Sequence, residues 1–322
     1  MDDRRRRSGA AGAPAALLIA GPTASGKSAL AVEVARRVGG VVINADSMQV
    51  YRDLRVLTAR PTQAEEAAAP HVLFGHVDAA TTHSAGLWLA EAAAEIARAR
   101  ATGRVPVVVG GTGLHFLALV RGLSAIPAVP ADVRTATRER FAGAHAETMH
   151  AALAAVDPAT AARLRPTDPQ RILRALEVHA ATGRSLASFQ GARAAPTLGE
   201  GEWSGLFLAP DRERLRAIIE ARFDAMVAGG ALEEAALMAA RELDPALPAM
   251  RAHGLPALIE HVTGRLTLEE AVARGKADTR AYVKRQFTFA RNQLPEFAFA
   301  EPGEGALAAA CARIDRDRFS RA

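Results

Sequence analysis

A glycine-rich octapeptide near the start of the chain restricts the fold more than any other feature of the sequence. Residues 21–28 read Gly-Pro-Thr-Ala-Ser-Gly-Lys-Ser and satisfy the pattern G-x-x-x-x-G-K-[ST]. In such a loop, backbone N–H groups surround phosphate oxygens, Lys27 neutralises phosphate charge, and the hydroxyl of Ser28 holds a Mg²⁺ ion. The pattern predicts a phosphate site and leaves open whether the phosphates belong to a nucleotide. The predicted phosphate-binding residues are Gly21, Pro22, Thr23, Ala24, Ser25, Gly26, Lys27 and Ser28.

The segments around this loop alternate between strand-like and helical patterns. Residues 17–20 and 41–44 are short apolar runs typical of buried strands, and residues 28–38 between them have helical spacing. A second helical segment over 85–101 leads into a third apolar run over 106–109. This alternation predicts an α/β protein with a P-loop NTPase-like parallel sheet and helices on both of its faces.

The pattern changes after Gly122, where helical segments follow one another without a strand signal until about residue 183. Residues 126–130 and 191–205 are rich in Gly, Ala and Pro, which is typical of connecting segments. A strand-like run over 205–209 then precedes a mostly helical remainder. We therefore predict a disordered basic tail over 1–14, a P-loop α/β core over 15–123 and 202–310, a helical insertion over 124–201, and a C-terminal tail over 311–322.

The composition is that of an ordinary globular protein, with 49% hydrophobic and 23% charged residues and a net charge of +5. A single cysteine, Cys311, excludes an internal disulfide and a cysteine-based zinc cluster, and it favours a reducing, cytoplasmic location. Arg4 to Arg7 before an uncharged run resemble a signal peptide, but Pro14 interrupts the apolar part and cleavage would fall just before the first strand. No segment approaches the ~20 apolar residues of a membrane span, so we expect no membrane partner.

Two polar motifs follow strands that lead to the same edge of the predicted sheet. Asp46 comes directly after the second strand, and the run Gly110 to Gly113 with Thr112 follows the third. Ligands of open α/β sheets bind at the carboxyl ends of the strands. Asp46 could therefore be a Mg²⁺ ligand or a general base, or it could cap a following helix. Thr112 is expected to line the substrate.

Arginine-rich segments supply further candidates. Arg222, on a helix predicted over 212–226, could clamp a diphosphate or lie in solvent. Residues 274–291 hold six basic residues and one acidic residue, so the net charge of this segment, +5, equals that of the whole chain. Arg280, Lys284 and Arg291 share a helix face with Phe287, a pattern that favours nucleic-acid binding over a merely solvated face.

The histidines do not predict a metal site. His71, His76 and His83 are five and seven residues apart, which fits no i, i+4 zinc pair, and no cysteine is near them.

In combination, these motifs resemble bacterial tRNA dimethylallyltransferases, also called tRNA isopentenyltransferases. The resemblance runs in order from about residue 17 to 295 and rests on residues 21–28, 46–52, 58–61, 109–114, 168–177 and 284–288. It implies transfer of a dimethylallyl group from dimethylallyl diphosphate to the exocyclic amine of the adenine immediately 3′ of the anticodon, with release of diphosphate. It also implies that the insertion over 124–201 binds tRNA. We expect the enzyme to be a cytoplasmic monomer.

The resemblance assigns roles to individual residues. The loop holds the donor diphosphate with Mg²⁺ on Ser28 and with Arg222 as a second cationic clamp. Asp46 orients and deprotonates the adenine amine, and Thr112 lines the meeting point of donor and adenine. The implied tRNA contacts are Asp46, Ser47, Met48, Gln49, Thr112, Arg134, Gln170, Arg171, Ile172, Leu173, Arg174, Arg251, Lys284, Arg285, Gln286, Phe287 and Arg291.

The chain departs from the family pattern at three places, and one of them is Arg60, which stands where lysine is common. Where many members have Arg-x-x-Gly-Tyr-Arg-Gln, this chain reads Arg251-Ala-His-Gly-Leu-Pro-Ala, and Phe289 stands where others carry tryptophan. Two alternatives are an enzyme that prenylates free adenine nucleotides and a P-loop small-molecule kinase. The first does not need the insertion or the basic segment, and the second lacks an Asp-containing Walker B strand in this sequence.

Overall fold

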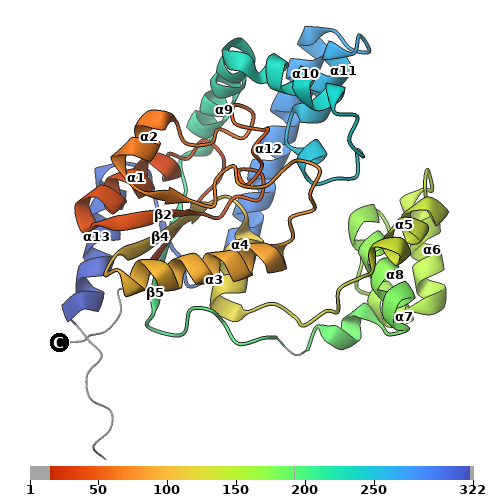
Figure 1. Cartoon of the computed structure of the whole chain (residues 1–322), viewed down its shortest axis with the longest axis horizontal. Coiled ribbons are helices and arrows are strands. Elements are labelled where there is room, and N and C mark those ends of the chain that lie inside the picture. The colour runs from red at the N-terminus through yellow and green to blue at the C-terminus, as the bar shows by residue number, and fades with distance from the viewer. Residues whose placement is uncertain (1–14, 192, 320–322) are drawn as a thin grey trace, which may run out of the picture. The chain divides into compact units, whose positions relative to one another are not determined.

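The computed structural model describes residues 15–191 and 193–319, and these residues form two compact units (Figure 1). The α/β unit comprises the chain up to Val120 and from Thr197 onward, and the helical unit comprises Arg121–Pro196. We predicted these boundaries at 124 and 201. The return to the α/β unit comes earlier because Leu198 is only 1% exposed and belongs to the core of that unit. The predicted tail over 1–14 lies outside the described residues.

A six-stranded parallel sheet in the order β3-β2-β4-β1-β5-β6 forms the centre of the α/β unit. Strands β1, β2 and β4 are buried along their whole length, as expected for short apolar strands covered on both faces. The predicted α/β fold with a parallel P-loop core is confirmed. The two edge strands were not predicted because they span only two and three residues. The strands are β1 Ala16–Ala20, β2 Gly40–Asn44, β3 His71–Val72, β4 Val105–Gly110, β5 Trp203–Leu208 and β6 Ala298–Ala300.

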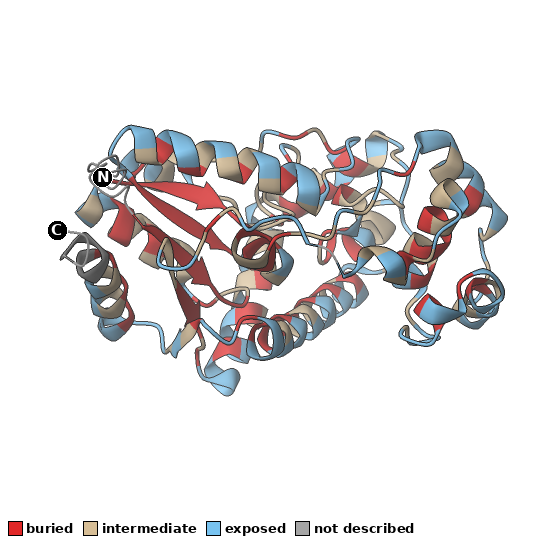
Figure 2. Cartoon of the chain, turned by 90° about the horizontal axis from the view of Figure 1, so that it is seen from below, coloured by how far each residue is buried: buried red, intermediate tan, exposed pale blue. Residues whose placement is uncertain are grey.

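Helices cover both faces of this sheet, so that its strands lie buried between them (Figure 2). Alternate residues of each strand point to opposite faces: Leu17 packs against α1 and α13, whereas Leu18 packs in the core formed with α3, α4, α9 and α12. The helices of this unit are α1 Lys27–Val38, α2 Gln63–Ala68, α3 Ala85–Ala101, α4 Gly113–Arg121, α9 Arg212–Met226, η2 Val227–Ala231, α10 Leu232–Ala240, η3 Ala249–Arg251, α11 Leu255–Val262, α12 Leu268–Gln293 and α13 Glu304–Phe319.

Helix α13 corrects the prediction of a C-terminal tail from residue 311. Ala310 and Ile314 are 0% and 4% exposed and pack with α1 against the sheet. The sequence of this helix is rich in alanine and charged residues, and its few larger apolar residues give a weak periodic signal. Burial by the neighbouring helix, rather than its own amphipathic pattern, therefore stabilises it.

The helical unit has its own apolar core around Leu153, Ile172 and Val178. Asp168 caps α8, because its side chain accepts a hydrogen bond from the N–H of Arg171 at 3.2 Å. The helical content predicted for residues 131–183 is confirmed. The helices are α5 Ala131–Arg140, α6 Ala146–Val156, α7 Pro158–Ala161, α8 Pro169–Thr182 and η1 Leu186–Phe189.

Within residues 15–191 and 193–319, no helix combines the length and apolar character needed to cross a membrane.

Candidate functional site

The glycine-rich loop connects β1 to α1, as the sequence pattern requires. Gly26 has a φ of +82°, a conformation open to glycine at little cost, and it places Lys27 at the first position of α1. No side chain caps this helix, so its first N–H groups face the loop and are available to an anion. The ammonium of Lys27 donates to the carbonyl oxygen of Pro22 at 3.1 Å. The loop therefore connects a strand to a helix as its sequence predicted, and phosphate binding by it stays a prediction.

A pocket of about 520 Å³ opens over this loop within the α/β unit. Its lining combines the cations Lys27 and Arg222 with the carboxylate of Asp46. Apolar side chains from two other segments complete the wall, among them Val56 and Phe223. The pocket thus offers positive charge, the carboxylates of Asp46 and Glu65, and an apolar surface to the same ligand.

The charges in this pocket influence one another. Burial lowers the pKa of Lys27 to about 8, the negative charge of Asp46 opposes this shift, and the nearby Arg222 adds to it. Burial also lowers the pKa of Arg222, against the attraction of Glu65 and Asp46. Two cations are therefore held close together in a desolvated site, and a bound diphosphate would neutralise them.

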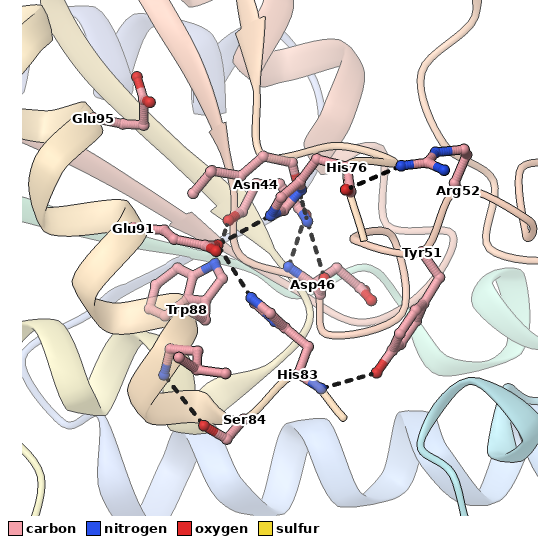
Figure 3. A network of polar contacts seen from close by, with 12 residues as sticks. Asn44, Asp46, Tyr51, Arg52, His76, His83, Ser84, Trp88, Glu91 and Glu95 are labelled. Carbon is pink, nitrogen blue, oxygen red and sulfur yellow. Dashed lines mark hydrogen bonds and ion pairs between the residues drawn. The ribbon is translucent and has the colours of Figure 1, made fainter. Parts of the chain in front are cut away.

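Asp46 follows β2 in a turn that Asn44 holds on both sides (Figure 3). The side chain of Asn44 accepts from the N–H of Asp46 at 2.8 Å and donates to its carbonyl at 3.0 Å. The Oδ1 atom of Asp46 accepts from the N–H of Met48 at 2.9 Å. Residues 47–50 form turns rather than a helix, so the helix-capping alternative for Asp46 is wrong.

Thr112 lies beside Asp46 because β2 and β4 are neighbouring strands. Its hydroxyl oxygen accepts from the N–H of Ser47 at 2.9 Å, and its own N–H donates to the carbonyl of Ala45 at 3.2 Å. A Cβ at Gly110 would lie 2.2 Å from the carbonyl carbon of Ala45, so only glycine permits this close approach. The predicted meeting of the two strand ends is confirmed.

Gln286 connects the phosphate loop to this strand edge. Its Oε1 accepts from the N–H of Thr23 at 3.1 Å, and its Nε2 donates to the carbonyl of Gly111 at 2.9 Å. The residue is 6% exposed. The resemblance implied that Gln286 contacts tRNA, whereas in the structure both amide atoms of its side chain hold backbone of the site.

Tyr282 and His253 line the pocket and were not singled out from the sequence. Tyr282 lies one turn before Gln286 on α12, and its hydroxyl donates to the carbonyl of Gly111 at 3.4 Å. Burial and the charge of Asp46 raise the pKa of Tyr282. The ring of His253 lies 4.2 Å from that of Tyr282, and burial lowers the pKa of His253. The i, i+4 spacing from Gln286 was the only sequence signal for Tyr282.

Glu234 on α10 holds the pocket wall and was likewise missed. Its carboxylate accepts from three consecutive backbone N–H groups, those of Arg55, Val56 and Leu57, at 2.7, 2.6 and 2.9 Å. Gln49, implied to contact tRNA, donates instead to the carbonyls at residues 58 and 59. The wall segment over 55–59 is therefore fixed by side chains from elsewhere in the fold.

The remaining residues implied to contact tRNA divide into buried, half-buried and exposed sets. Ile172 and Phe287 are 0% and 8% exposed and pack in apolar cores, which corrects their assignment to an RNA-contacting surface. Leu173, Arg134, Arg174, Ser47 and Met48 are half-buried. The exposed residues are Gln170, Arg171, Arg251, Lys284, Arg285 and Arg291.

A second hollow of about 300 Å³ lies between α9 and α12 and contains the predicted basic face. Lys284 and Arg291 line it together with Phe287, and Arg212 of α9 joins them. Arg280 is paired with Glu220 at 3.2 Å, so part of the positive charge is compensated. The shared face of α12 predicted from the sequence is confirmed.

The fold and the site define a P-loop α/β protein whose phosphate loop opens into a pocket that also holds a carboxylate. Comparison with known proteins gives the particular family. The model described as IPP transferase matches residues 49–293, and the model described as isopentenyl transferase matches residues 14–75. The chain belongs to the tRNA dimethylallyltransferase family, as the following relatives also show.

Curated relatives named tRNA dimethylallyltransferase resemble the chain over most of its length. The protein from Rhodopseudomonas palustris is 60% identical over 291 residues, which cover 90% of this chain and 91% of the relative. The protein from Methylocella silvestris is 58% identical, with 90% and 95% covered. Among solved structures, the full-length tRNA isopentenylpyrophosphate transferase from Bacillus halodurans has a TM-score of 0.68 at 29% identity and covers 96% of this chain and 98% of its own.

Proposed function

We propose that the chain transfers a dimethylallyl group from dimethylallyl diphosphate to the exocyclic amine of the adenine immediately 3′ of the anticodon in tRNA and releases diphosphate. The observation that carries the proposal is the single pocket in which Lys27, Arg222 and Asp46 meet beside an apolar wall. A phosphate loop alone suits many nucleotides. The additional carboxylate and apolar wall suit a donor with a charged head and a short hydrocarbon tail.

Donor binding uses the phosphate loop as a cradle for the leaving group. The N–H groups at the start of α1 and the side chains of Lys27 and Arg222 surround the diphosphate. The negative charge on the bridging oxygen grows as the bond to the dimethylallyl carbon breaks, so these cations stabilise the transition state more than the ground state. The apolar residues of the pocket, including Ile219 and Phe223, receive the hydrocarbon tail.

The oxygen atoms in the pocket also fit a Mg²⁺ ion, which prefers carboxylate, hydroxyl and phosphate oxygens. Ser28 and Asp46 both line the pocket and offer such atoms. We propose that Ser28 is a ligand of this ion. When bound with the donor, Mg²⁺ supplies further charge neutralisation for the diphosphate.

Asp46 acts as the acceptor of the amine proton. An exocyclic aromatic amine is a weak nucleophile, and a carboxylate within reach of its N–H strengthens it. The amine nitrogen forms a bond to the first carbon of the dimethylallyl group, the bond from that carbon to the diphosphate oxygen breaks, and the proton passes to Asp46. Thr112, next to Asp46 through Ser47, lines the position of the adenine.

The acceptor is a base in a stacked anticodon loop, so it must turn out of the stack to enter the pocket. Exposed cations on α12, such as Lys284 and Arg285, contribute phosphate contacts, and residues of the helical unit such as Arg171 contribute others. The proposal includes a monomeric enzyme in the cytoplasm, where the tRNA pool is found.

The test combines substrates with a variant of the proposed base. Purified protein is incubated with Mg²⁺, dimethylallyl diphosphate and either an unmodified tRNA transcript or adenosine monophosphate, and nucleosides are analysed by mass spectrometry. We expect an adduct only from tRNA, at the adenine after the anticodon. Asp46→Asn should abolish transfer and leave tRNA binding by gel shift unchanged.

Other outcomes decide between the alternatives. An adduct on adenosine monophosphate would indicate a free-nucleotide enzyme. No adduct with either acceptor, together with ATP turnover in a separate assay, would indicate a kinase. Normal transfer by Asp46→Asn would remove this residue as the proton acceptor.

A further inference from the structure

Two histidines and a glutamate converge on the α/β unit outside the pocket (Figure 3). His76 follows β3, His83 lies two residues before α3, and Glu91 lies on α3. One atom, Oε2 of Glu91, lies 3.0 Å from Nε2 of His76 and 3.1 Å from Nε2 of His83. The potential ligand atoms of the three residues all lie within 4.8 Å of one another. The mechanism above uses none of these residues.

The arrangement matches a metal site with two imidazoles and one carboxylate. Zinc binds imidazole nitrogen and carboxylate oxygen at ~2.0–2.2 Å, so neighbouring ligands of a tetrahedral ion are separated by roughly 3.4 Å. The observed N···O separations of 3.0 and 3.1 Å are within a few tenths of an ångström of that value. Small side-chain movements would therefore admit an ion between the three residues. We propose that His76, His83 and Glu91 form a binding site for Zn²⁺ or a similar divalent transition metal.

Burial of the three side chains is uneven. The side chain of His83 is 6% exposed, whereas those of His76 and Glu91 are 33% and 38% exposed. An ion can therefore enter from solvent and remain anchored to an inner imidazole. The exposed side leaves room for a water molecule as a fourth ligand, since zinc sites with three protein ligands commonly keep one position for water.

The ion would join the segment before α3 to the helix itself. His83 is adjacent in sequence to Ser84, whose side chain caps α3 by accepting from the N–H of Leu87 at 3.2 Å. One turn before Glu91, the indole of Trp88 donates to the carbonyl of Asn44 at 2.7 Å, and Asn44 holds the backbone of Asp46 (Figure 3). The site thus lies on the structural support of the pocket without touching it, and we assign it a stabilising role.

The spacing of the histidines did not predict this site, because its third ligand is a glutamate eight residues after His83. Neither the interval between His76 and His83 nor that between His83 and Glu91 is a helical pair. The loop that leads into α3 brings the three residues together.

The test measures metal binding directly on the full chain without a histidine tag. The protein is stripped with a chelator and titrated with Zn²⁺ against a coloured chelator, with excess Mg²⁺ present to occupy oxygen ligands in the pocket. We expect one saturable site per chain. His83→Ala and Glu91→Gln should each weaken binding at least about tenfold, and Zn²⁺ should raise the thermal midpoint of the wild type but not of these variants.

Matched controls lie on the same helix and elsewhere in the chain. Glu95→Gln changes a carboxylate of α3 that pairs with Arg98 at 2.6 Å instead of the histidines, and it should bind Zn²⁺ like the wild type. His150→Ala removes an imidazole that bonds a backbone oxygen of the helical unit and should also bind normally. Glu91→Gln is the milder variant, because its amide oxygen still accepts from both imidazoles.

Two results would overturn the proposal. One is the absence of saturable Zn²⁺ binding by the wild type. The other is full binding by both His83→Ala and Glu91→Gln, which would place the ion elsewhere and leave the cluster as a hydrogen-bonded group only.

Discussion

Replacing Gln286 with leucine tests whether this residue positions the phosphate loop or contacts tRNA. Leucine is similar in size and fills the same interior position, but it offers neither an acceptor to the N–H of Thr23 nor a donor to the carbonyl of Gly111. The hydroxyl of Tyr282 still reaches that carbonyl at 3.4 Å. The N–H of Thr23 is therefore the group that loses its partner.

The size of the effect follows from that lost partner. A buried donor without an acceptor costs about 1–3 kcal/mol, and we take about 2 kcal/mol for this partly buried one. In a unit of this size, 1 kcal/mol corresponds to about 2–4 °C, so the thermal midpoint should fall by about 4–8 °C. Loosening of the loop that holds the diphosphate should raise KM for dimethylallyl diphosphate about tenfold, which is about 1.4 kcal/mol.

Steady-state kinetics with each substrate varied in turn separate the two roles. We expect Gln286→Leu to raise KM for dimethylallyl diphosphate and to leave KM for tRNA within about twofold, since no contact with RNA is lost. Thr288→Ala is the control, because its exposed hydroxyl on the same helix bonds only the backbone of Lys284. A raised KM for tRNA with an unchanged KM for the donor would refute the positioning role.

Three further predictions concern the pocket and the basic face of α12. Burial lowers the pKa of Lys27 to about 8, so the side chain is positively charged below that pH and loses its charge above it. Donor affinity measured by calorimetry should therefore be level below pH 8 and fall above it, and Lys27→Met should bind weakly at every pH with no such fall. Glu234→Ala removes the acceptor of three backbone N–H groups, which should lower the local stability of residues 55–57 by about 2 kcal/mol or more. Hydrogen exchange of these N–H groups should therefore accelerate about 30-fold or more. Glu233→Ala changes the neighbouring exposed glutamate, and in this variant residues 55–57 should exchange as in the wild type. Equal exchange rates in the two variants would contradict the proposal that Glu234 holds this segment. Lys284→Ala combined with Arg285→Ala should raise KM for tRNA and flatten its salt dependence by removing phosphate contacts, and an unchanged salt slope would identify a solvated face.

Much of the site could be predicted because its residues belong to short contiguous motifs. Each motif directly follows a strand: the phosphate loop follows β1, Asp46 follows β2, and Thr112 follows β4. The carboxyl ends of neighbouring parallel strands lie together at one edge of the sheet. Local pattern also found the long helices, since their periodicity extends over several turns. The edge strands β3 and β6 are too short to produce such a signal.

Errors arose where a residue's environment depends on distant packing. Ile172, Gln286 and Phe287 stand inside motifs whose other members are exposed, and motif membership alone does not say which side chain faces the interior. Residues from 304 onward contain too few large apolar side chains to predict α13, which is stabilised by its contact with α1 and the sheet.

The sequence by itself determined the phosphate loop, the alternation of strands and helices, and the family, because each depends on residues that are neighbours along the chain. Only the tertiary structure decided that Gln286 holds Thr23 across 263 residues, that Glu234 fixes the pocket wall, and that Glu91 joins His76 and His83. These contacts form when helices and loops pack on the sheet. Their energy comes from burial and from pairing polar groups in the interior, and no local pattern records which distant group will be the partner.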